Sequence, residues 1–274
     1  MRKLLVAVSI VITAVLFYFN QPDRTEFDNT KLAIPACELG EQPIMTRVSY
    51  FVDLSLSQSF KPSLAQQQVD LSNLILGNSC LPLRRELSSF EYTNFKLSGE
   101  EYFDDIYSLG SNAVGSDVLK PIRENPLDFY VFVVPNHHWV FEDGTTGITD
   151  RELNNSYILL ADDASLDTLE HEFGHLMWAN HSETLLFSLL QGNLERATRP
   201  ESRHLVKPYA RAYSCSNAGT VMSYEDIRLP IYSSPSIQYR SESCGNKLNA
   251  DNRRRVLEYI DTLREQTSSD RSAN

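Results

Sequence analysis

The chain has 274 residues, a hydrophobic content of 42% and a formal net charge of −11. This length and this hydrophobic content are sufficient for one large domain, or two small ones, with a buried core. The negative charge argues against nucleic acid as a partner, because no basic stripe is available to neutralise phosphates.

The N-terminal residues 1–20 are predicted to be a signal peptide or an N-terminal membrane anchor. Arg2 and Lys3 precede an apolar run over residues 4–19, whose length lies between that of a signal peptide core and that of a full span. No small-x-small cleavage site follows, which favours the uncleaved anchor. Either interpretation predicts export to the periplasm or the extracellular space, secreted or anchored, with residues 21–43 as a polar tether.

Four cysteines are spread over the chain, at Cys37, Cys80, Cys215 and Cys244. An even number in an exported chain indicates two disulfides. Of the three possible pairings we favour Cys37–Cys80 and Cys215–Cys244, because each pair lies on one side of residues 171–181. Free buried cysteines are the alternative.

Strands and helices alternate in the first part of the chain. Periodicity and composition predict strands at 44–56, 85–97, 127–135 and 157–161, and helices at 62–76 and 100–123, the latter broken near 110–115. This alternation before residue 165 predicts an α+β fold with a mixed, mostly parallel twisted sheet. Further on, a helix is predicted at 184–195, a loop-rich region at 215–239, an amphipathic helix at 252–265 and a disordered tail at 266–274.

A helix is predicted to carry the histidine-rich stretch at residues 171–181. Its start is assigned to three residues that could cap the first turn, Asp162, Asp163 and Ser165. Its apolar stripe consists of residues spaced three and four apart, namely Leu166, Leu169, Phe173 and Leu176. The histidines lie roughly on the opposite face, where they can line a cleft.

His171 and His175 are four residues apart, so on a helix both imidazoles can bind one ion. Glu172 projects about 100° around the helix from His171, beside such an ion rather than on it. A general base acting on a metal-bound water would lie there. The spacing H-E-x-x-H on a helix is the zinc-peptidase pattern for this reason.

Two further features make the pattern more specific. His181 follows His175 by six residues, and residues 219–224 read Gly-Thr-Val-Met-Ser-Tyr, as in a Met-turn. With these features the chain resembles the metzincin zinc endopeptidases, whose pattern is H-E-x-x-H-x-x-G-x-x-H followed by a Met-turn. Ser182 after the third histidine is similar to the matrixin version and Tyr224 to the serralysin and astacin version, so no subfamily, matrixin-like or reprolysin-like, is assigned.

The resemblance implies a metzincin-like catalytic domain over residues 44–265, with an upper subdomain at 44–181 and a lower one at 182–265. It implies one catalytic Zn²⁺ bound by His171, His175 and His181. Glu172 would be the general base, and the substrate would be a peptide or protein. Tyr224 would serve as a fifth ligand or oxyanion donor unless it packs in the core, and Met222 would pack beneath the metal.

One position departs from the family pattern, because Trp178 stands where metzincins have glycine. That glycine lets the chain turn back so that the third histidine reaches the metal. A tryptophan with positive φ is strained by roughly 1–2 kcal/mol. The turn therefore either strains Trp178 or moves to Asn180, since asparagine tolerates the left-handed conformation.

Two alternative functions follow from the same residues. In a gluzincin-type peptidase Glu195, twenty residues past His175, would replace His181 as the third ligand. In an inactive, zinc-binding metzincin-like module, Trp178 would have distorted the site. The Met-turn argues against the first alternative, and retention of Glu172 argues against the second.

Overall fold

The computed structural model describes residues 29–37, 42–182 and 198–272. Three predicted features lie outside these residues: the N-terminal segment at 1–20, the helix at 184–195 and the alternative ligand Glu195. Within the residues described, no helix combines the length and the apolar character that a membrane span requires.

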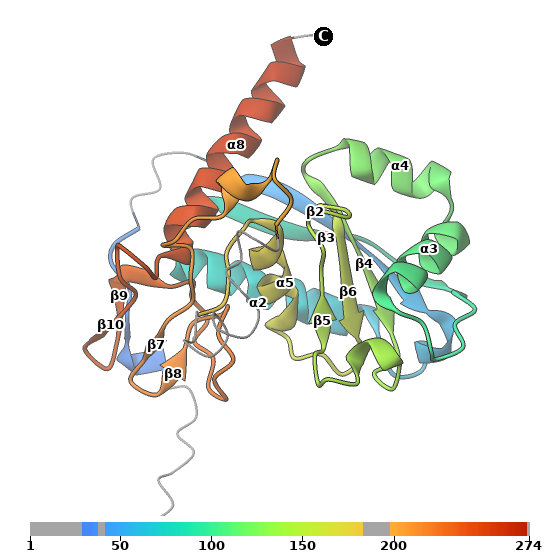
Figure 1. Cartoon of the computed structure of the whole chain (residues 1–274), viewed down its shortest axis with the longest axis horizontal. Coiled ribbons are helices and arrows are strands. Elements are labelled where there is room, and N and C mark those ends of the chain that lie inside the picture. Colours follow the sequence, from blue (N-terminus) through green and yellow to red (C-terminus); the bar gives the residue numbers. More distant parts are fainter. Residues whose placement is uncertain (1–28, 38–41, 183–197, 273–274) are drawn as a thin grey trace, which may run out of the picture.

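A five-stranded sheet forms the centre of the fold (Figure 1). Its strands, in spatial order, are β3 (Leu83–Thr93), β2 (Ile44–Asp53), β4 (Asp128–Val134), β6 (Tyr157–Ala161) and β5 (Gly147–Ile148). The first four are parallel, and β5 pairs antiparallel with β6. The predicted mixed, mostly parallel sheet is thus confirmed, but the sequence analysis did not find β5, which is only two residues long.

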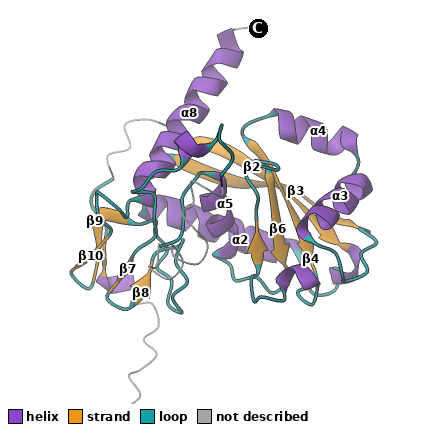
Figure 2. Ribbon diagram, viewed as in Figure 1, coloured by secondary structure: helices purple, strands orange, loops and turns teal. Residues whose placement is uncertain are grey.

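Helices cover both faces of the sheet, as Figure 2 shows. One face packs against α2 (Pro62–Asn78), α5 (Thr168–Leu176) and α8 (Asn252–Ser272). The other face packs against α3 (Phe103–Val114) and α4 (Ser116–Glu124). Burial on both faces explains why β4 and β6 are nearly continuous apolar runs rather than alternating ones.

The predicted break in the helix at 100–123 occurs at a single residue. Gly115 has φ +95° and separates α3 from α4, a backbone conformation that favours glycine. Gly110, at the start of the predicted break, instead lies inside α3. A Cβ there would be 2.3 Å from the Phe132 ring, so this glycine permits close packing of α3 on the sheet.

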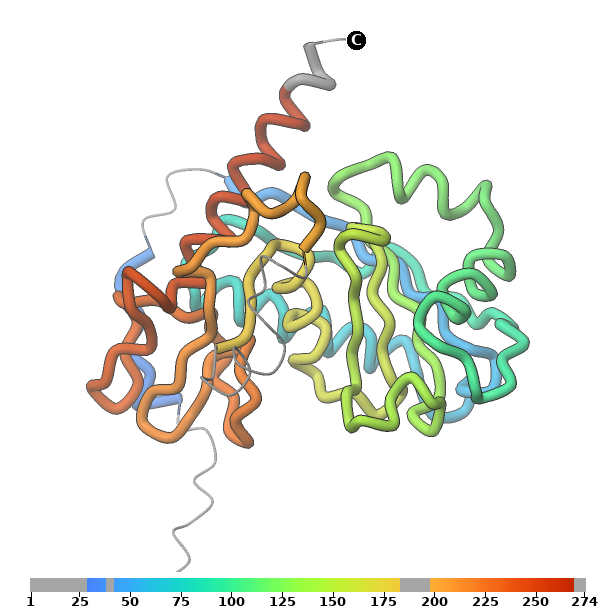
Figure 3. Tube along the Cα trace, in the orientation of Figure 1, coloured from blue at the N-terminus to red at the C-terminus, as the bar shows by residue number. Residues whose placement is uncertain are grey.

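The C-terminal part contains two small antiparallel sheets. One has the order β1 (Leu32–Ala33), β9 (Ser234–Tyr239) and β10 (Glu242–Cys244), and the other pairs β7 (Ser214–Cys215) with β8 (Ala218–Gly219). The N-terminal strand β1 therefore lies beside a strand two hundred residues further along the chain (Figure 3). Short 3₁₀ turns occupy Asn29–Lys31, Leu54–Leu56, Trp139–Phe141 and Arg203–Leu205.

Both predicted disulfides are present. Cys37 bonds to Cys80 and Cys215 to Cys244, with Cα–Cα distances of 5.2 and 5.1 Å. Such bonds persist in oxidising compartments, which indicates an extracytoplasmic environment. The last helix, α8, continues past the predicted end at residue 265 and extends away from the rest of the chain (Figure 1).

Candidate metal centre

The histidine-bearing helix α5 begins later than the sequence pattern predicts. Its N-cap is Asp167, and the cap position makes no side-chain hydrogen bond to the helix. The predicted capping by Asp162 and Asp163 is wrong, because their carboxylates accept hydrogen bonds from Asn136 at 2.8 and 2.7 Å. Ser165 also precedes the helix and donates to Asp167 at 2.6 Å. The two aspartates therefore join the loop after β6 to the loop after β4 instead of starting the helix.

The apolar face of α5 packs into the core as predicted. Leu169, Phe173 and Leu176 are buried in the cluster formed with α2, α8 and the sheet. Leu166 lies before the helix and is only partly buried. The stripe therefore fixes which side of α5 faces the sheet and which side carries the histidines.

Three histidines converge at the end of α5. The ring centroids of His171 and His175 are 5.0 Å apart, and that of His181 lies 5.0 and 4.5 Å from them. One nitrogen from each ring falls within 4.8 Å of the others, and among the described residues this is a group that could hold a metal ion. The structure thus brings together the three residues that the sequence spacing singled out.

Two of the imidazoles are oriented by hydrogen bonds at their outer nitrogens. His171 Nδ1 lies 2.8 Å from the carbonyl oxygen of Val221, and His181 Nδ1 lies 2.6 Å from the hydroxyl of Tyr224. The carbonyl can only accept, so Nδ1 of His171 carries the proton and Nε2 keeps its lone pair. The Nε2 atoms of the two rings face each other at 2.9 Å, as ligands of one ion would.

Burial keeps the three rings neutral. It lowers the pKa of His171, lowers that of His175 well below the ordinary value, and lowers that of His181 to about 3. For His181 the neighbouring His171 and Arg151 act in the same direction. Neutral imidazoles are the form that binds metal, so the cluster could hold a metal ion.

Glu172 is buried next to the histidine cluster, with only 4% of its surface exposed. Burial raises the pKa of its carboxyl group to about 8. The edge strand β5 passes close by, since a Cβ on Gly147 would lie 2.7 Å from Glu172 Oε1. Glu172 and the three histidines line one cavity of about 790 Å³, which β5 borders.

Tyr224 stands at the edge of this cavity and is 72% exposed. The alternative that it packs in the core is therefore wrong. Its hydroxyl reaches His181 rather than the centre of the cluster. Partial desolvation by the cavity wall, together with the carboxyl groups of Glu172 and Asp143, raises the pKa of Tyr224, so the phenol stays protonated at neutral pH.

Met222 is fully buried and packs against α5 at Gly174. A Cβ on Gly174 would be 2.2 Å from Met222 Sδ. The helical glycine between His171 and His175 therefore lets the methionine approach the helix backbone directly. The segment of Val221 and Met222 therefore meets α5 twice, through the Val221 carbonyl at His171 and through Met222 at Gly174.

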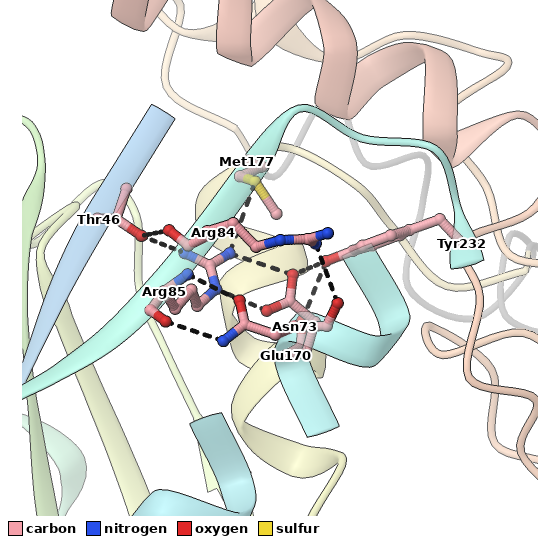
Figure 4. Close-up of polar contacts among 7 residues, drawn as sticks. All are labelled: Thr46, Asn73, Arg84, Arg85, Glu170, Met177 and Tyr232. Carbon is pink, nitrogen blue, oxygen red and sulfur yellow. Dashed lines mark hydrogen bonds and ion pairs between the residues drawn. The ribbon is translucent and has the colours of Figure 1, made fainter. Parts of the chain in front are cut away.

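A buried ion pair anchors α5 from behind, as Figure 4 shows. Arg85 of β3 donates from Nε and Nη2 to the two carboxylate oxygens of Glu170, at 2.7 and 3.1 Å, and these side chains are 1% and 0% exposed. Tyr232 donates to the same carboxylate at 2.8 Å. The guanidinium also lies 3.4 Å above the Phe173 ring. Sequence analysis missed this network, because Arg85 and Glu170 have no local pattern in common.

The turn after α5 decides between the two predicted conformations. Trp178 has φ 65°, so the tryptophan itself takes the left-handed position, and the alternative turn at Asn180 is wrong. Its N–H donates to the His175 carbonyl at 3.0 Å, and that of Ala179 donates to the Gly174 carbonyl at 2.9 Å. This is the Schellman pattern, which usually has glycine at the position of Trp178.

Comparisons with known proteins give a likeness of fold. No protein-family model and no curated protein sequence matches the chain. A solved structure described as a chaperone-substrate complex matches with a TM-score of 0.59 and 13% identity, over 81% of this chain and 35% of that one. Metalloproteinase-II from Bacteroides fragilis matches with a TM-score of 0.42 and 14% identity, over 86% of this chain and 58% of that one.

These figures limit what the neighbours can show. The chain spans about a third of the first neighbour and less than two thirds of the second. At 13% identity the first match establishes a shared fold and nothing about activity, and a TM-score of 0.42 is too low to support an argument. Function must therefore be argued from the site itself.

Proposed function

We propose that this chain is a zinc-dependent endopeptidase of metzincin type. The observation that carries the proposal is the convergence of three neutral imidazoles and one buried carboxylate on a single cavity. A purely structural zinc site is usually closed by four protein ligands. Three histidines next to a base leave room for a water molecule and a substrate carbonyl.

When bound, zinc would lower the pKa of a coordinated water and polarise the scissile carbonyl. Glu172 would accept the proton from that water and return it to the leaving amine. Because burial raises its pKa, the ionised carboxylate of Glu172 would bind a proton readily. A cation held by the adjacent histidines would keep the carboxylate ionised before the reaction. The neighbouring strand β5 excludes solvent from one side of the carboxylate.

Tyr224 has two roles in this proposal. In the arrangement described, its hydroxyl orients His181 through the outer ring nitrogen, as hydrogen bonds to metal-binding histidines commonly do. Because the side chain is largely exposed, it is free to rotate and donate to the oxyanion of the reacting peptide.

The proposed substrate is a peptide or protein outside the cytoplasm. The two disulfides support the extracytoplasmic setting. Anchoring through the N-terminal segment stays a prediction, because residues 1–20 are not among those described. The net charge of −11 argues against nucleic acid as a partner.

The alternatives can be weighed against the site. His181 occupies the third position of the cluster, which favours metzincin-type over gluzincin-type ligation, although Glu195 lies outside the described residues. The alternative of an inactive binding module rests on Trp178, which stands where the metzincin pattern has glycine. Glu172 argues against it, since a site that only holds zinc needs no buried base.

The test is the variant Glu172→Gln in the full chain. We expect it to keep the zinc content of the wild type and to cleave an unfolded protein at least ~10³-fold more slowly. The exposed Glu201→Gln serves as the matched control and should cleave normally. Full activity in Glu172→Gln, or a wild type without zinc, would rule out the proposed mechanism.

A further inference from the structure

The turn from His175 to His181 is built from residues that the metzincin pattern does not include. Trp178 holds a left-handed conformation that glycine adopts freely and other residues adopt rarely. Something must therefore hold the indole in place. The contacts around Trp178 identify the groups that do so.

Arg151, in the loop between β5 and β6, spans this turn. Its guanidinium carbon lies 3.8 Å above the Trp178 ring. One terminal nitrogen donates to the His175 carbonyl at 2.9 Å and another lies 3.3 Å from Asn180 Oδ1. A planar guanidinium can stack and donate in two directions at once, which a lysine cannot. Arg151 thus contacts the turn before, at and after Trp178.

Asn180 transmits this arrangement to the ligand that follows it. Its side-chain amide donates to the Trp178 carbonyl at 2.9 Å. Its backbone N–H donates to Asn252 Oδ1 at 3.2 Å, and its carbonyl accepts from Asn252 Nδ2 at 3.0 Å and from the Ala212 N–H at 2.9 Å. Every polar group of Asn180, the residue immediately before His181, therefore takes part in a hydrogen bond.

We propose that Arg151 is a positioning residue for the third metal ligand. By stacking on Trp178 and bonding to His175 and Asn180, it fixes the turn that presents His181 to the ion. The inference rests on the metal site of the proposed function, but not on peptide cleavage. In this chain a tertiary contact does what glycine does in the family pattern.

The test measures cobalt binding to the full chain, because the visible spectrum of Co²⁺ reports the number and geometry of its ligands. We expect Arg151→Ala to bind Co²⁺ roughly 10- to 100-fold more weakly than the wild type, as loss of an outer contact to metal ligands typically does. The spectrum should shift as His181 is lost from the ion. Arg151→Lys should be intermediate, because it keeps the charge without the planar fork.

Testing Arg151→Ala in the Trp178→Gly variant separates a role in positioning His181 from a role in the stability of the whole protein. In Trp178→Gly the turn needs no support, so adding Arg151→Ala there should cost less than about threefold in Co²⁺ affinity. The matched control is Arg123→Ala, which removes a guanidinium that lies 5.5 Å from the Tyr107 ring on the other face of the sheet. It should leave affinity and spectrum unchanged. Circular dichroism of each variant reports whether it is folded.

Unchanged Co²⁺ affinity and spectrum in folded Arg151→Ala would overturn the proposal. Equal losses in the wild-type and Trp178→Gly backgrounds would overturn it as well, and so would a wild type that binds no Co²⁺. If Arg151→Ala does not fold, the same comparison is made with Arg151→Lys. A wild type that binds Co²⁺ but cleaves no peptide would refute the proposed function while leaving this inference to stand on the metal data.

Discussion

The first two histidines of the cluster and the third are held by different means. His171 and His175 share one face of α5, so their separation follows from helix geometry. His181 follows a turn whose last residue, Asn180, contacts Arg151 and Asn252 from other parts of the chain. The comparison teaches that a helix can bring two histidines together by spacing alone, whereas placing the third beside them requires tertiary support.

The strongest test of this comparison removes the ligands one at a time. We expect His175→Ala and His181→Ala each to weaken zinc binding by roughly 10²- to 10³-fold, a share of the ~10–16 kcal/mol typical of tightly held zinc. Metal analysis after dialysis against a competing chelator measures it. Full zinc retention in His181→Ala together with loss in Glu195→Ala would favour the gluzincin alternative.

Breaking the anchor behind α5 should affect folding more than the ligand geometry. Arg85→Ala leaves Glu170 buried without its partner, at a cost of about 3–5 kcal/mol in the free energy of unfolding. Urea unfolding of the metal-free protein measures this value. The double variant Arg85→Met with Glu170→Leu should recover much of the loss, because it removes both buried charges. A loss below ~1 kcal/mol in Arg85→Ala would contradict the anchoring role.

The glycine between the helical histidines offers a smaller perturbation of the same helix. Gly174→Ala places a Cβ against Met222 Sδ, and overpacking of this kind costs typically 1–3 kcal/mol. Gly77→Ala in α2 is the control, since its Cβ would meet only the Arg84 guanidinium at 3.5 Å. Thermal unfolding should separate the two variants. Equal midpoints would show that Met222 moves aside freely.

The smallest expected effect is that of Trp178→Gly. Glycine relieves roughly 1–2 kcal/mol of backbone strain, and the loss of the buried indole and of its stacking on Arg151 offsets that gain. Zinc affinity should not fall, and peptide cleavage should be at least that of the wild type. Asn180→Ala is the variant to compare with Trp178→Gly, because it removes the hydrogen bonds of the Asn180 side chain to Arg151 and to the Trp178 carbonyl. Loss of zinc in Trp178→Gly would mean that the indole is indispensable.

Regular local patterns determined much of the fold in advance. The strand predicted at 157–161 coincides with β6, and the helix predicted at 62–76 lies within α2. Apolar periodicity and unbroken apolar runs carry this information because each reflects the geometry of one element. The spacing of His171, His175 and His181 likewise identified the cluster, and the order of the cysteines favoured the pairing that the structure contains.

Contacts between distant segments were decided only by the tertiary structure. Arg85 and Glu170 look like ordinary charged residues in the sequence, and only the packing of β3 on α5 reveals that they are buried together. Asp162 and Asp163 are residue types that often cap helices, but Asn136 in the loop after β4 donates hydrogen bonds to both of their carboxylates. The sequence showed that Trp178 was out of place without showing how it is tolerated. That depended on Arg151, because the stability of a strained turn comes from whatever packs around it rather than from the residues within it.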